Sequence, residues 1–186
     1  MSWLCDYKKD IAKYTHDTGS SAWKHILGEQ GLWALLEYRI SAAVYRSSLP
    51  RYVKFPLRLA LTIWHKIIEI LTGINLPCTV KIGPGLHLPH CGYRVLHSAV
   101  VMGCDCCISQ GVTIGISGRG EFRGVPVIGD RVYVGVNAVV AGKIHVGNDA
   151  VIAANSLVTR DLGPCCVALG VPAQVVSTKG SGDYLS

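Results

Sequence analysis

The chain has 186 residues, of which 49% are hydrophobic and 16% are charged, and its formal net charge is +6. This composition is sufficient for a buried core and excludes a largely disordered protein. It contains no block of five or six basic residues, so we expect no nucleic-acid partner. The N-terminal residues lack the apolar segment of a signal peptide, and no uncharged run of about 18 apolar residues could span a membrane. We therefore expect a cytoplasmic protein.

Residues 1–75 hold all four tryptophans and few glycines, and they predict an N-terminal helical region. Residues 29–46 place apolar side chains on one helical face, and residues 57–71 repeat such a stripe. A shorter helix is expected over residues 3–14. We expect two or three helices that pack on the end of the domain that follows.

The helix expected over residues 57–71 is strongly apolar and has basic residues nearby. Pro50 and Pro56 bracket a break before it, and Gly73 is suited to cap its C-terminus. One interpretation is weak association with a membrane surface, which would make the protein peripheral. We favour burial against neighbouring helices or a second subunit, because apolar stripes usually face a core.

Aliphatic residues recur at intervals of six through residues 76–176, and a polar tail follows at residues 177–186. Neither the period of a strand nor that of a helix gives this spacing, which is the signature of a parallel β-helix built from hexapeptide repeats. Each hexad forms one flat side of a triangular prism, and a small residue often follows the aliphatic one at the corner. The inward positions are Ile82, Leu88, Leu96, Met102, Ile108, Ile114, Ile128, Val134, Val140, Val146, Ile152 and Val158.

The repeat is interrupted twice, and each interruption predicts a loop pushed out of the prism. Eight residues instead of six separate Leu88 from Leu96, and fourteen instead of twelve separate Ile114 from Ile128. The second loop has the sequence ISGRGEFRGVP. Loops on a rigid scaffold commonly carry function, so we look for the site there.

The first loop contains His90, which is a candidate general base. An imidazole titrates near neutral pH, so its neutral form can accept a proton there. His87 and His97 lie equally close, and the local sequence does not rank the three. A histidine in an ordinary surface turn is the alternative interpretation.

The eight cysteines do not form the paired CxxC motifs typical of a zinc site. Cysteine is small enough for the corners and inner positions of a β-helix, and thiols outside the secretory route stay reduced. We interpret the cysteines as structural and expect no metal; a metal or redox site is the alternative.

The stretch from Ile82 to Val176 resembles the hexapeptide-repeat acyltransferases and, among them, the serine acetyltransferase family. The matching segments are IGPGLHLPHCGYRV, ISQGVTIG, VIGDRVYVGVNAVVAG and ALGVPAQVV. The resemblance implies a left-handed β-helix that assembles as a homotrimer and transfers acetyl from acetyl-CoA to a hydroxyl. It also implies that the coenzyme lies in the groove between two neighbouring prisms.

The resemblance implies roles for particular residues. The family's catalytic histidine falls on His90, which would take the proton of the acceptor hydroxyl and pass it to the departing thiolate, with no acyl-enzyme. Backbone N–H groups near Gly115 or Gly118 would stabilise the oxyanion. Corner geometry alone is the alternative role for the small residues of the coenzyme stretch. The residues expected to contact the coenzyme are Gly115, Gly135, Val136, Ala153, Ala154, Arg160 and Lys179.

Three sites depart from the family. Asn75 stands where the family has an aspartate that orients the catalytic histidine, and an amide can hold a tautomer but cannot offset an imidazolium charge. Pro89 replaces an aspartate that contacts the amino group of serine. Gly124 and Val125 replace the arginine–histidine pair that meets the serine carboxylate, and Arg123, one place away, could substitute for it in a shifted loop.

These departures affect the recognition of serine and the orientation of the base, and they leave the coenzyme groove intact. The helical region is also shorter than in typical serine acetyltransferases, which favours a single trimer. Chains of this shorter type resemble the sugar and polysaccharide O-acetyltransferases. We therefore expect an acetyl-CoA-dependent O-acetyltransferase acting on a sugar or polysaccharide hydroxyl. The alternatives are serine O-acetylation, which belongs to cysteine biosynthesis, and a non-catalytic CoA-binding scaffold. A nucleotide-sugar N-acetyltransferase would need a domain that the chain lacks.

Overall fold

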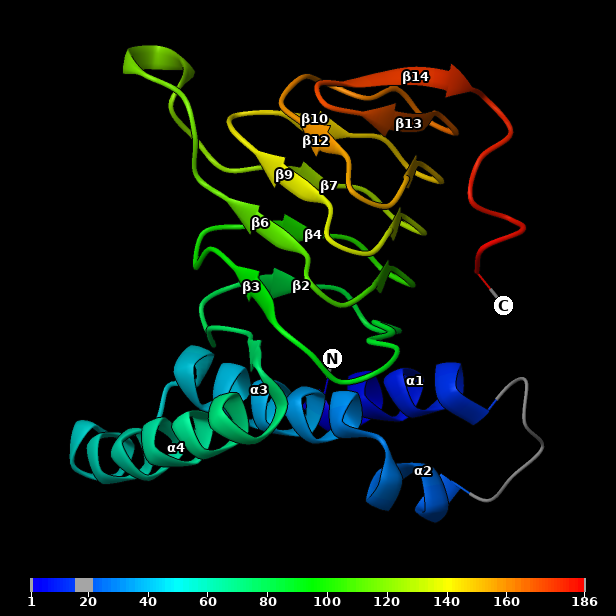
Figure 1. The fold of residues 1–186 in the computed structure, drawn as a ribbon. Helices are drawn as coiled ribbons and strands as arrows, with labels where there is room; N and C mark the ends of the chain where they lie inside the picture. The colour runs from blue at the N-terminus through cyan, green and yellow to red at the C-terminus, as the bar shows by residue number, and fades with distance from the viewer. Residues whose placement is uncertain (1, 16–21, 186) are drawn as a thin grey trace.

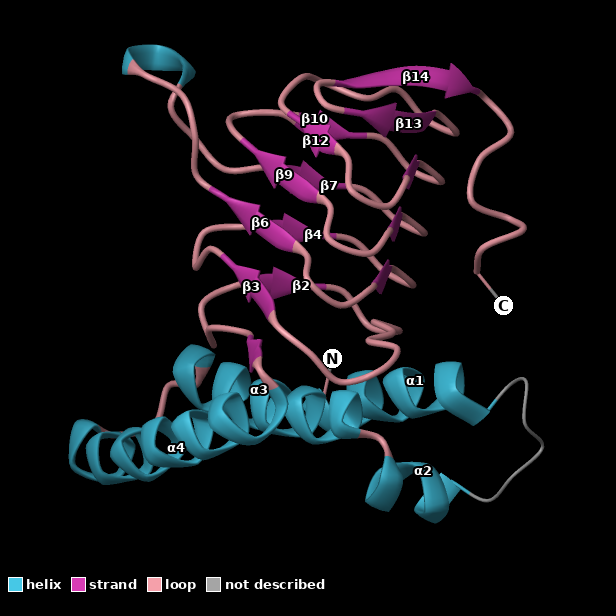
Figure 2. Cartoon of the chain, viewed as in Figure 1, coloured by secondary structure: helices cyan, strands magenta, loops and turns pink. Residues whose placement is uncertain are grey.

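Three sheets of short strands wind around one axis and form a triangular prism above a layer of helices (Figure 1). The computed structural model describes residues 2–15 and 22–185. Colouring by secondary structure shows the same division, with the N-terminal helices at the base, the strands above them and one short helical turn on a projecting loop (Figure 2). The expected fold, a left-handed parallel β-helix with N-terminal helices, is confirmed.

Each sheet forms one face of the prism, and its strands come from successive coils of the chain. Sheet I contains β1 (Ile74–Asn75), β3 (Arg94–Leu96), β6 (Thr113–Gly115), β9 (Val139–Ala141) and β12 (Leu157–Val158). Sheet II contains β2 (Lys81–Ile82), β4 (Val101–Met102), β7 (Val127–Ile128) and β10 (His145–Val146). Sheet III contains β5 (Cys107–Ile108), β8 (Tyr133–Val134), β11 (Val151–Ile152), β13 (Val167–Gly170) and β14 (Ala173–Ser177). Among the described strands, the pairings are parallel except that of β13 with β14, which closes the end of the prism.

The twelve inward positions of the six-residue repeat are confirmed, since none of these side chains is more than 7% exposed. A second buried position lies two residues before each of them, as at Val100, Val112 and Val132. The small residue at the corner is required by close backbone packing. A Cβ on Gly83 would lie 2.6 Å from the carbonyl oxygen of Gly103 in the next coil.

The described part of the N-terminal region contains α1 (Trp3–Thr15), α2 (Ala22–Gly28), α3 (Gln30–Arg46) and α4 (Arg51–Thr72). The expected break between Pro50 and Pro56 is wrong, because α4 begins directly after Pro50 and contains Pro56. Proline removes one helical N–H, and here that loss falls on the exposed N-terminal end of the helix, where water can satisfy the carbonyl. Gly73 caps α4 as predicted, with a left-handed φ of 72°.

The helices cap the open end of the prism through buried polar contacts. The Asp10 carboxylate of α1 accepts hydrogen bonds from the backbone N–H groups of Gly85 (2.8 Å) and Leu86 (3.0 Å) in the first coil. Asp10 also pairs with Arg39 of α3, whose Nη1 donates to the carbonyl of Ile82 at 2.9 Å. A β-helix end exposes unpaired backbone groups, and these side chains satisfy them.

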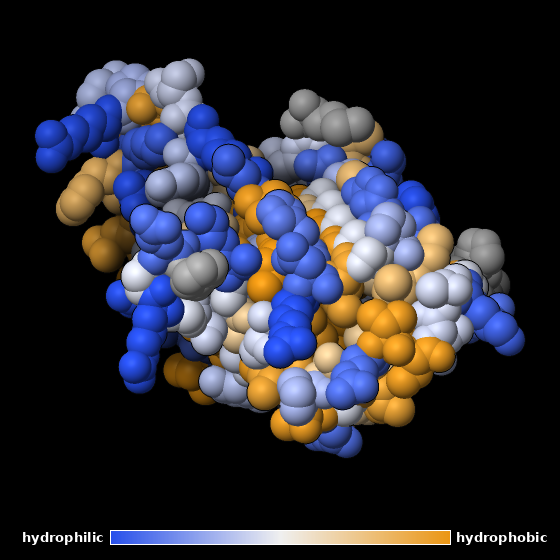
Figure 3. Space-filling model, turned by 90° about the horizontal axis from the view of Figure 1, so that it is seen from above, coloured by the Kyte–Doolittle hydropathy of each residue, from blue (hydrophilic) through white to orange (hydrophobic). Residues whose placement is uncertain are grey.

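One face of α4 is exposed and apolar, and its side chains follow helical spacing. They are Tyr52, Phe55, Leu59, Ile63, Ile67 and Ile70. None of the described helices is long and apolar enough to cross a membrane. The opposite end of the molecule, seen from above, also shows hydrophobic surface between hydrophilic projections (Figure 3). Exposed apolar side chains of β13, β14 and the turn between them include Leu169, Val171, Val175 and Val176.

The chain turns from sheet to sheet at three edges of the prism. At the edge between sheets III and I, which we call the His90 edge, the stacked corners are held by backbone bonds such as Gly92 N–H to Thr72 and Asn155 N–H to Val136. The edge between sheets I and II, which we call the loop edge, carries the extruded residues 116–126, including the short 3-10 helix η1 (Gly120–Phe122). This loop projects away from the prism in Figure 1.

Candidate active site

His90 lies in the small loop that interrupts the His90 edge, and its side chain is exposed. Its φ of 64° is left-handed, but corner residues of the same edge, such as Asn137 and Asn155, adopt the same conformation. The backbone shape therefore follows from the corner and is no evidence of strain. Among the described residues, no side chain or backbone group hydrogen-bonds to the His90 imidazole, so both ring nitrogens face solvent or a ligand.

The structure ranks the three histidines that the sequence leaves equal. The His87 ring is half-buried, packs edge-on against Tyr14 at 4.6 Å between centroids, and has Nδ1 3.9 Å from Sγ of Cys107. Nδ1 of His97 accepts a hydrogen bond of 3.2 Å from the backbone N–H of Ala99, which stabilises a local turn. Only His90 of these three presents an unengaged imidazole, which is what a general base needs.

Asn75 lies in β1, and its amide is held by a carboxylate from α4. Nδ2 of Asn75 donates a hydrogen bond of 2.6 Å to Oε1 of Glu69. Hydrogen bonds from Lys66, at 2.5 Å, and from Asn75 keep the pKa of Glu69 below its usual value. The first coil therefore holds a negative charge directly behind Asn75, and no local feature of the sequence indicated this role for Glu69.

The expected coenzyme residues fall into three places. Gly135, Val136, Ala153 and Ala154 line the His90 edge in the two coils above the extruded second loop, where Asn155 N–H bonds back to Val136. A Cβ on Gly135 would lie 2.7 Å from the backbone nitrogen of Ala154, so corner packing by itself requires this glycine. Gly135 is buried in this corner, whereas Ala154 is exposed on the same edge.

The remaining expected coenzyme residues do not lie on the His90 edge. Gly115 ends β6 and Arg160 follows β12, so both lie where sheet I turns toward sheet II at the loop edge. A Cβ on Gly115 would find its nearest atom 4.0 Å away, so corner crowding does not require a glycine there. Lys179 lies in the tail after β14, next to Gly180, whose N–H bonds to the carbonyl of Cys165. One chain does not bring these residues together.

The extruded loop carries two arginines around a shallow hollow of about 720 Å³. Arg123 follows η1, and Arg119 precedes it. Both arginines line this hollow, together with Ser117 and Gly118. Sequence reasoning selected Arg123 and missed Arg119, although the composition of the loop contained it. Pro89 does not line this hollow. It lies in the His90 loop, where its carbonyl accepts a hydrogen bond from the Arg94 side chain.

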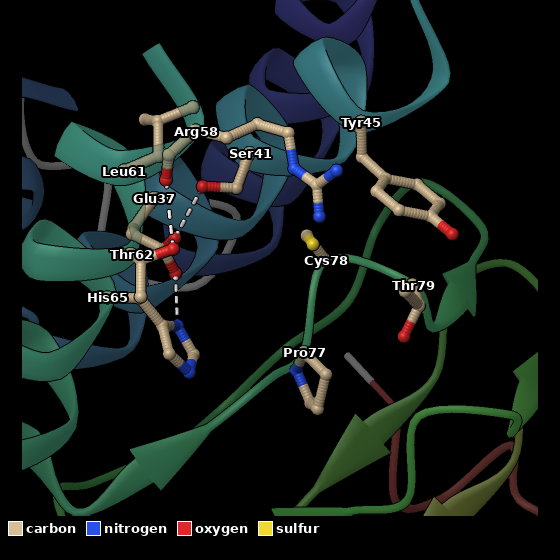
Figure 4. Close-up of a pocket in the computed structure, with 10 residues that line it drawn as sticks. All are labelled: Glu37, Ser41, Tyr45, Arg58, Leu61, Thr62, His65, Pro77, Cys78 and Thr79. Carbon is tan, nitrogen blue, oxygen red and sulfur yellow. Dashed lines mark hydrogen bonds and ion pairs between the residues drawn. The ribbon is translucent and has the colours of Figure 1, made fainter. Parts of the chain in front are cut away.

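A second cavity, of about 220 Å³, lies between α3, α4 and the first coil, and it contains reactive side chains (Figure 4). Buried Glu37 accepts a hydrogen bond of 2.6 Å from Ser41 and lies 2.9 Å from Nδ1 of His65. Because the carboxylate stands between the two, His65 does not contact the Ser41 hydroxyl and cannot activate it. Burial raises the pKa of the Cys78 thiol, which disfavours its nucleophilic thiolate form. This cavity therefore lacks a nucleophile–base pair.

The cysteines of the described chain are free thiols in different environments. Burial raises the pKa of Cys106 and of Cys107 to about 12, so neither is a ready nucleophile. Cys91 is exposed beside His90. Within residues 2–15 and 22–185, no three histidine, cysteine, aspartate or glutamate side chains are placed to hold a metal ion.

Comparisons with known proteins agree with this geometry. The family described as bacterial transferase hexapeptide (six repeats) matches residues 126–160. The serine acetyltransferase of Helicobacter pylori strain J99 is 36% identical over 157 residues, which cover 83% of this chain and 86% of that protein. The serine acetyltransferase of Synechococcus elongatus is 29% identical over 150 residues, and the chain spans only 58% of its length.

Solved structures give the same result for the fold. The Neisseria gonorrhoeae serine acetyltransferase superposes with a TM-score of 0.79 at 28% identity, covering 94% of this chain and 65% of that one. A serine acetyltransferase in complex with CoA superposes with a TM-score of 0.78 at 27% identity, covering 94% of this chain and 70% of that one. The chain belongs to the serine acetyltransferase family of hexapeptide-repeat transferases.

The expectation of a sugar or polysaccharide acceptor is contradicted by these comparisons, which place the chain among serine acetyltransferases. The short helical region favoured a sugar acceptor. The Helicobacter pylori enzyme is matched over 86% of its length, so a serine acetyltransferase can be this short. The loss of charged residues at positions 89, 124 and 125 also favoured a sugar acceptor, but the second loop carries another arginine, Arg119.

Proposed function

We propose that this protein is an acetyl-CoA-dependent serine O-acetyltransferase that uses His90 as its general base. The observation that carries the proposal is the unengaged, exposed imidazole of His90 on the prism edge that also bears the small residues Gly135 and Ala154. The sequence identity to serine acetyltransferases over most of the chain supports the choice of acceptor.

The proposed reaction is a direct transfer. His90 removes the proton of the serine hydroxyl as its oxygen attacks the thioester carbonyl carbon, and the carbonyl π electrons move to the oxygen. The tetrahedral intermediate collapses, the C–S bond breaks, and the imidazolium gives the proton to the departing thiolate. Backbone N–H groups of the loop edge, near Gly115, would stabilise the oxyanion. Asn75 would hold the His90 tautomer by accepting a hydrogen bond from the ring, with Glu69 behind it.

A homotrimer would complete the site. The His90 edge and the loop edge of one prism lie on opposite sides of sheet I, whose strands are two or three residues wide. That width corresponds to about 7–10 Å of extended chain. If the loop edge of one protomer faces the His90 edge of its neighbour, then Gly115, Arg160 and the extruded loop come to the same groove as His90.

Arg119 and Arg123 are the proposed partners of the serine carboxylate. The positions that carry an arginine–histidine pair in the family are Gly124 and Val125 here, and neither side chain offers a charge. Two arginines on the same loop can replace that pair, because a guanidinium binds a carboxylate with two parallel hydrogen bonds.

We assign the exposed apolar face of α4 to contact with a neighbouring protomer in this trimer. A monomer rarely leaves so large an apolar stripe in water. Flotation with anionic vesicles separates this assignment from membrane binding. The trimer assignment requires the protein to stay at the bottom of the gradient, and flotation of the purified protein would contradict it.

The proposal is tested by measuring release of free CoA from acetyl-CoA with a thiol reagent, with L-serine, L-serine methyl ester or no acceptor. The proposal expects fast release with L-serine and a much higher KM for the ester, which lacks the carboxylate. Binding of CoA without turnover on L-serine would contradict it and would support a CoA-binding scaffold instead.

A further inference from the structure

Arg94 is a fully buried arginine with no acidic partner. Its side chain is 0% exposed, and no aspartate or glutamate of the described chain forms an ion pair with it. Burial lowers the pKa of its guanidinium, which shows that the site is costly for a charge. A buried charge without a counter-ion is uncommon and needs many hydrogen bonds to persist.

The position of Arg94 in the repeat makes it exceptional. It lies two residues before inward-facing Leu96, at the second buried position of its hexad. The equivalent residues of sheet I in the next two coils are Val112 and Ala138, both buried and apolar. At Ser156 in the coil above, a small hydroxyl is buried. The fold therefore tolerates an apolar residue at this position, and the prism alone does not explain an arginine.

The guanidinium donates to five backbone carbonyl oxygens. Three belong to the His90 loop: Nη1 donates to His90 (3.2 Å) and Gly92 (3.3 Å), and Nη2 donates to Pro89. The other two belong to the next coil, where Nε is shared between Ile108 (3.0 Å) and Ser109 (3.1 Å). The carbonyl dipoles of the loop and of the coil above are thus oriented around one cation.

We propose that Arg94 is a positioning residue: its buried guanidinium fixes the backbone of residues 89–92 to the next coil and thereby sets the place of the His90 imidazole. The loop contains two residues more than a regular corner. Among the described residues, the backbone bonds Gly92 N–H to Thr72 and Arg94 N–H to Gly73 tie it to the chain below, and Gly111 N–H to Tyr93 (2.6 Å) ties its end to the coil above. The Arg94 side chain adds the contacts that join residues 89–92 to the coil above.

Arg94 does not bind substrate itself, because it is fully buried and each of its three guanidinium nitrogens donates to a backbone carbonyl. The inference rests on the proposed function only in that His90 acts as base. A displacement of a catalytic group by about 1 Å costs roughly 100-fold in rate, so loosening the loop acts on turnover before it acts on coenzyme binding.

The test compares Arg94→Met, Arg94→Lys and Arg39→Met in the full-length protein. Arg39 is a matched control, because it is also buried, at 4% exposed, and donates to prism carbonyls, but it lies at the helix–prism junction. Two readouts are used: steady-state kinetics with acetyl-CoA and L-serine, and hydrogen–deuterium exchange of the peptide spanning residues 88–96.

For Arg94→Met the proposal expects kcat to fall about 100-fold with KM for acetyl-CoA unchanged within twofold. It also expects at least tenfold faster exchange in residues 88–96, with the remaining prism unchanged. Arg94→Lys should recover part of both losses, because its ammonium can reach some of the five carbonyls. Arg39→Met should lower the melting temperature and leave kcat of the folded protein within twofold.

Unchanged exchange in residues 88–96 would overturn the proposal, as would a loss of activity that only follows the melting temperature. If Arg94→Met does not fold, Arg94→Lys decides by the same two readouts. Wild-type protein without turnover on L-serine would contradict the proposed function, and the exchange of residues 88–96 would still decide the role of Arg94.

Discussion

Glu69 of α4 holds the side-chain amide of Asn75 through a hydrogen bond of 2.6 Å from Nδ2 to Oε1. Because Nδ2 is engaged, the amide presents Oδ1 as its acceptor, which is the atom that could receive an N–H from a histidine. In the proposed pairing of Asn75 with His90, a carboxylate, Glu69, therefore lies behind the amide.

Glu69→Gln is expected to lower kcat roughly fivefold, because loss of the fixed amide orientation removes about 1 kcal/mol of hydrogen bonding. KM for acetyl-CoA should stay unchanged. Asn75→Asp alone should lower the melting temperature by about 2–4 °C, since it sets two carboxylates against each other. The double variant, Glu69→Gln with Asn75→Asp, should regain the melting temperature of the wild type. If the effects of the two substitutions on stability simply add, residues 69 and 75 are not coupled.

His90→Ala is expected to reduce kcat by about 10²–10⁴-fold and to leave CoA affinity unchanged, which is the usual contribution of a general base. Steady-state kinetics and isothermal titration with CoA measure the two quantities. His97→Ala is the matched control, since its ring stabilises only a local turn. Loss of CoA binding in His90→Ala would show that the histidine is structural.

Cys91→Ala is expected to keep kcat within about twofold of wild type, because direct transfer needs no acyl-enzyme. Cys91 is the exposed thiol beside His90, so it is the obvious competitor for a covalent step. Mass spectrometry of the protein after mixing with acetyl-CoA checks the same point. A stable acetyl group on Cys91 that transfers to serine would refute the direct mechanism.

Arg119→Gln and Arg123→Gln are each expected to raise KM for L-serine by at least tenfold, since a hydrogen bond to a charged group contributes about 1.5–3 kcal/mol. KM for acetyl-CoA should not change. Kinetics with both substrates varied measure this. Arg51→Gln, on α4, serves as the control for loss of one positive charge, and an equal effect there would point to a general electrostatic cause.

The stability of the protein should depend on pH through His65. Its hydrogen bond to Glu37 raises the pKa of the imidazole above the ordinary value of 6.5 in the folded state, although burial opposes the shift. The folded protein therefore binds the proton more tightly, so the stabilisation is full below pH 6.5 and is lost as the pH rises through the raised pKa. As the pH rises above 6.5, the melting temperature should fall more steeply for the wild type than for His65→Gln. Parallel curves for the two proteins would exclude the His65–Glu37 pair as the cause.

The prism was predictable because one property of the chain, an aliphatic residue every six positions, sets both the register and the inward face. The start of α4 was not predictable in this way, because a proline near the exposed end of a helix destabilises the helix less than a proline in its interior. The buried position of Arg94 was not predictable from the repeat. The same register places it inside the prism, two residues before Leu96, but apolar side chains define the repeat and it does not indicate a charged one there.

The candidate site was only partly predictable for physical reasons. The family resemblance selected His90 among the three histidines. The structure adds the reason: His87 contacts Tyr14 and Cys107, and His97 accepts a hydrogen bond from Ala99, whereas the His90 imidazole has no such contact. The Glu69–Asn75 contact depends on how the end of α4 turns into β1. The expected coenzyme residues divide between two edges of one prism and the C-terminal tail, so a single chain does not bring them together.

The most direct test of the proposed serine acetylation is to mix the purified protein with acetyl-CoA carrying a ¹³C-labelled acetyl group and L-serine, and to follow the products by NMR. The proposal predicts O-acetyl-L-serine in an amount equal to the CoA released, with the His90→Ala variant reduced by about 10²–10⁴-fold. Release of CoA no faster than the spontaneous hydrolysis of acetyl-CoA, or an unchanged rate of O-acetyl-L-serine formation in His90→Ala, would contradict it.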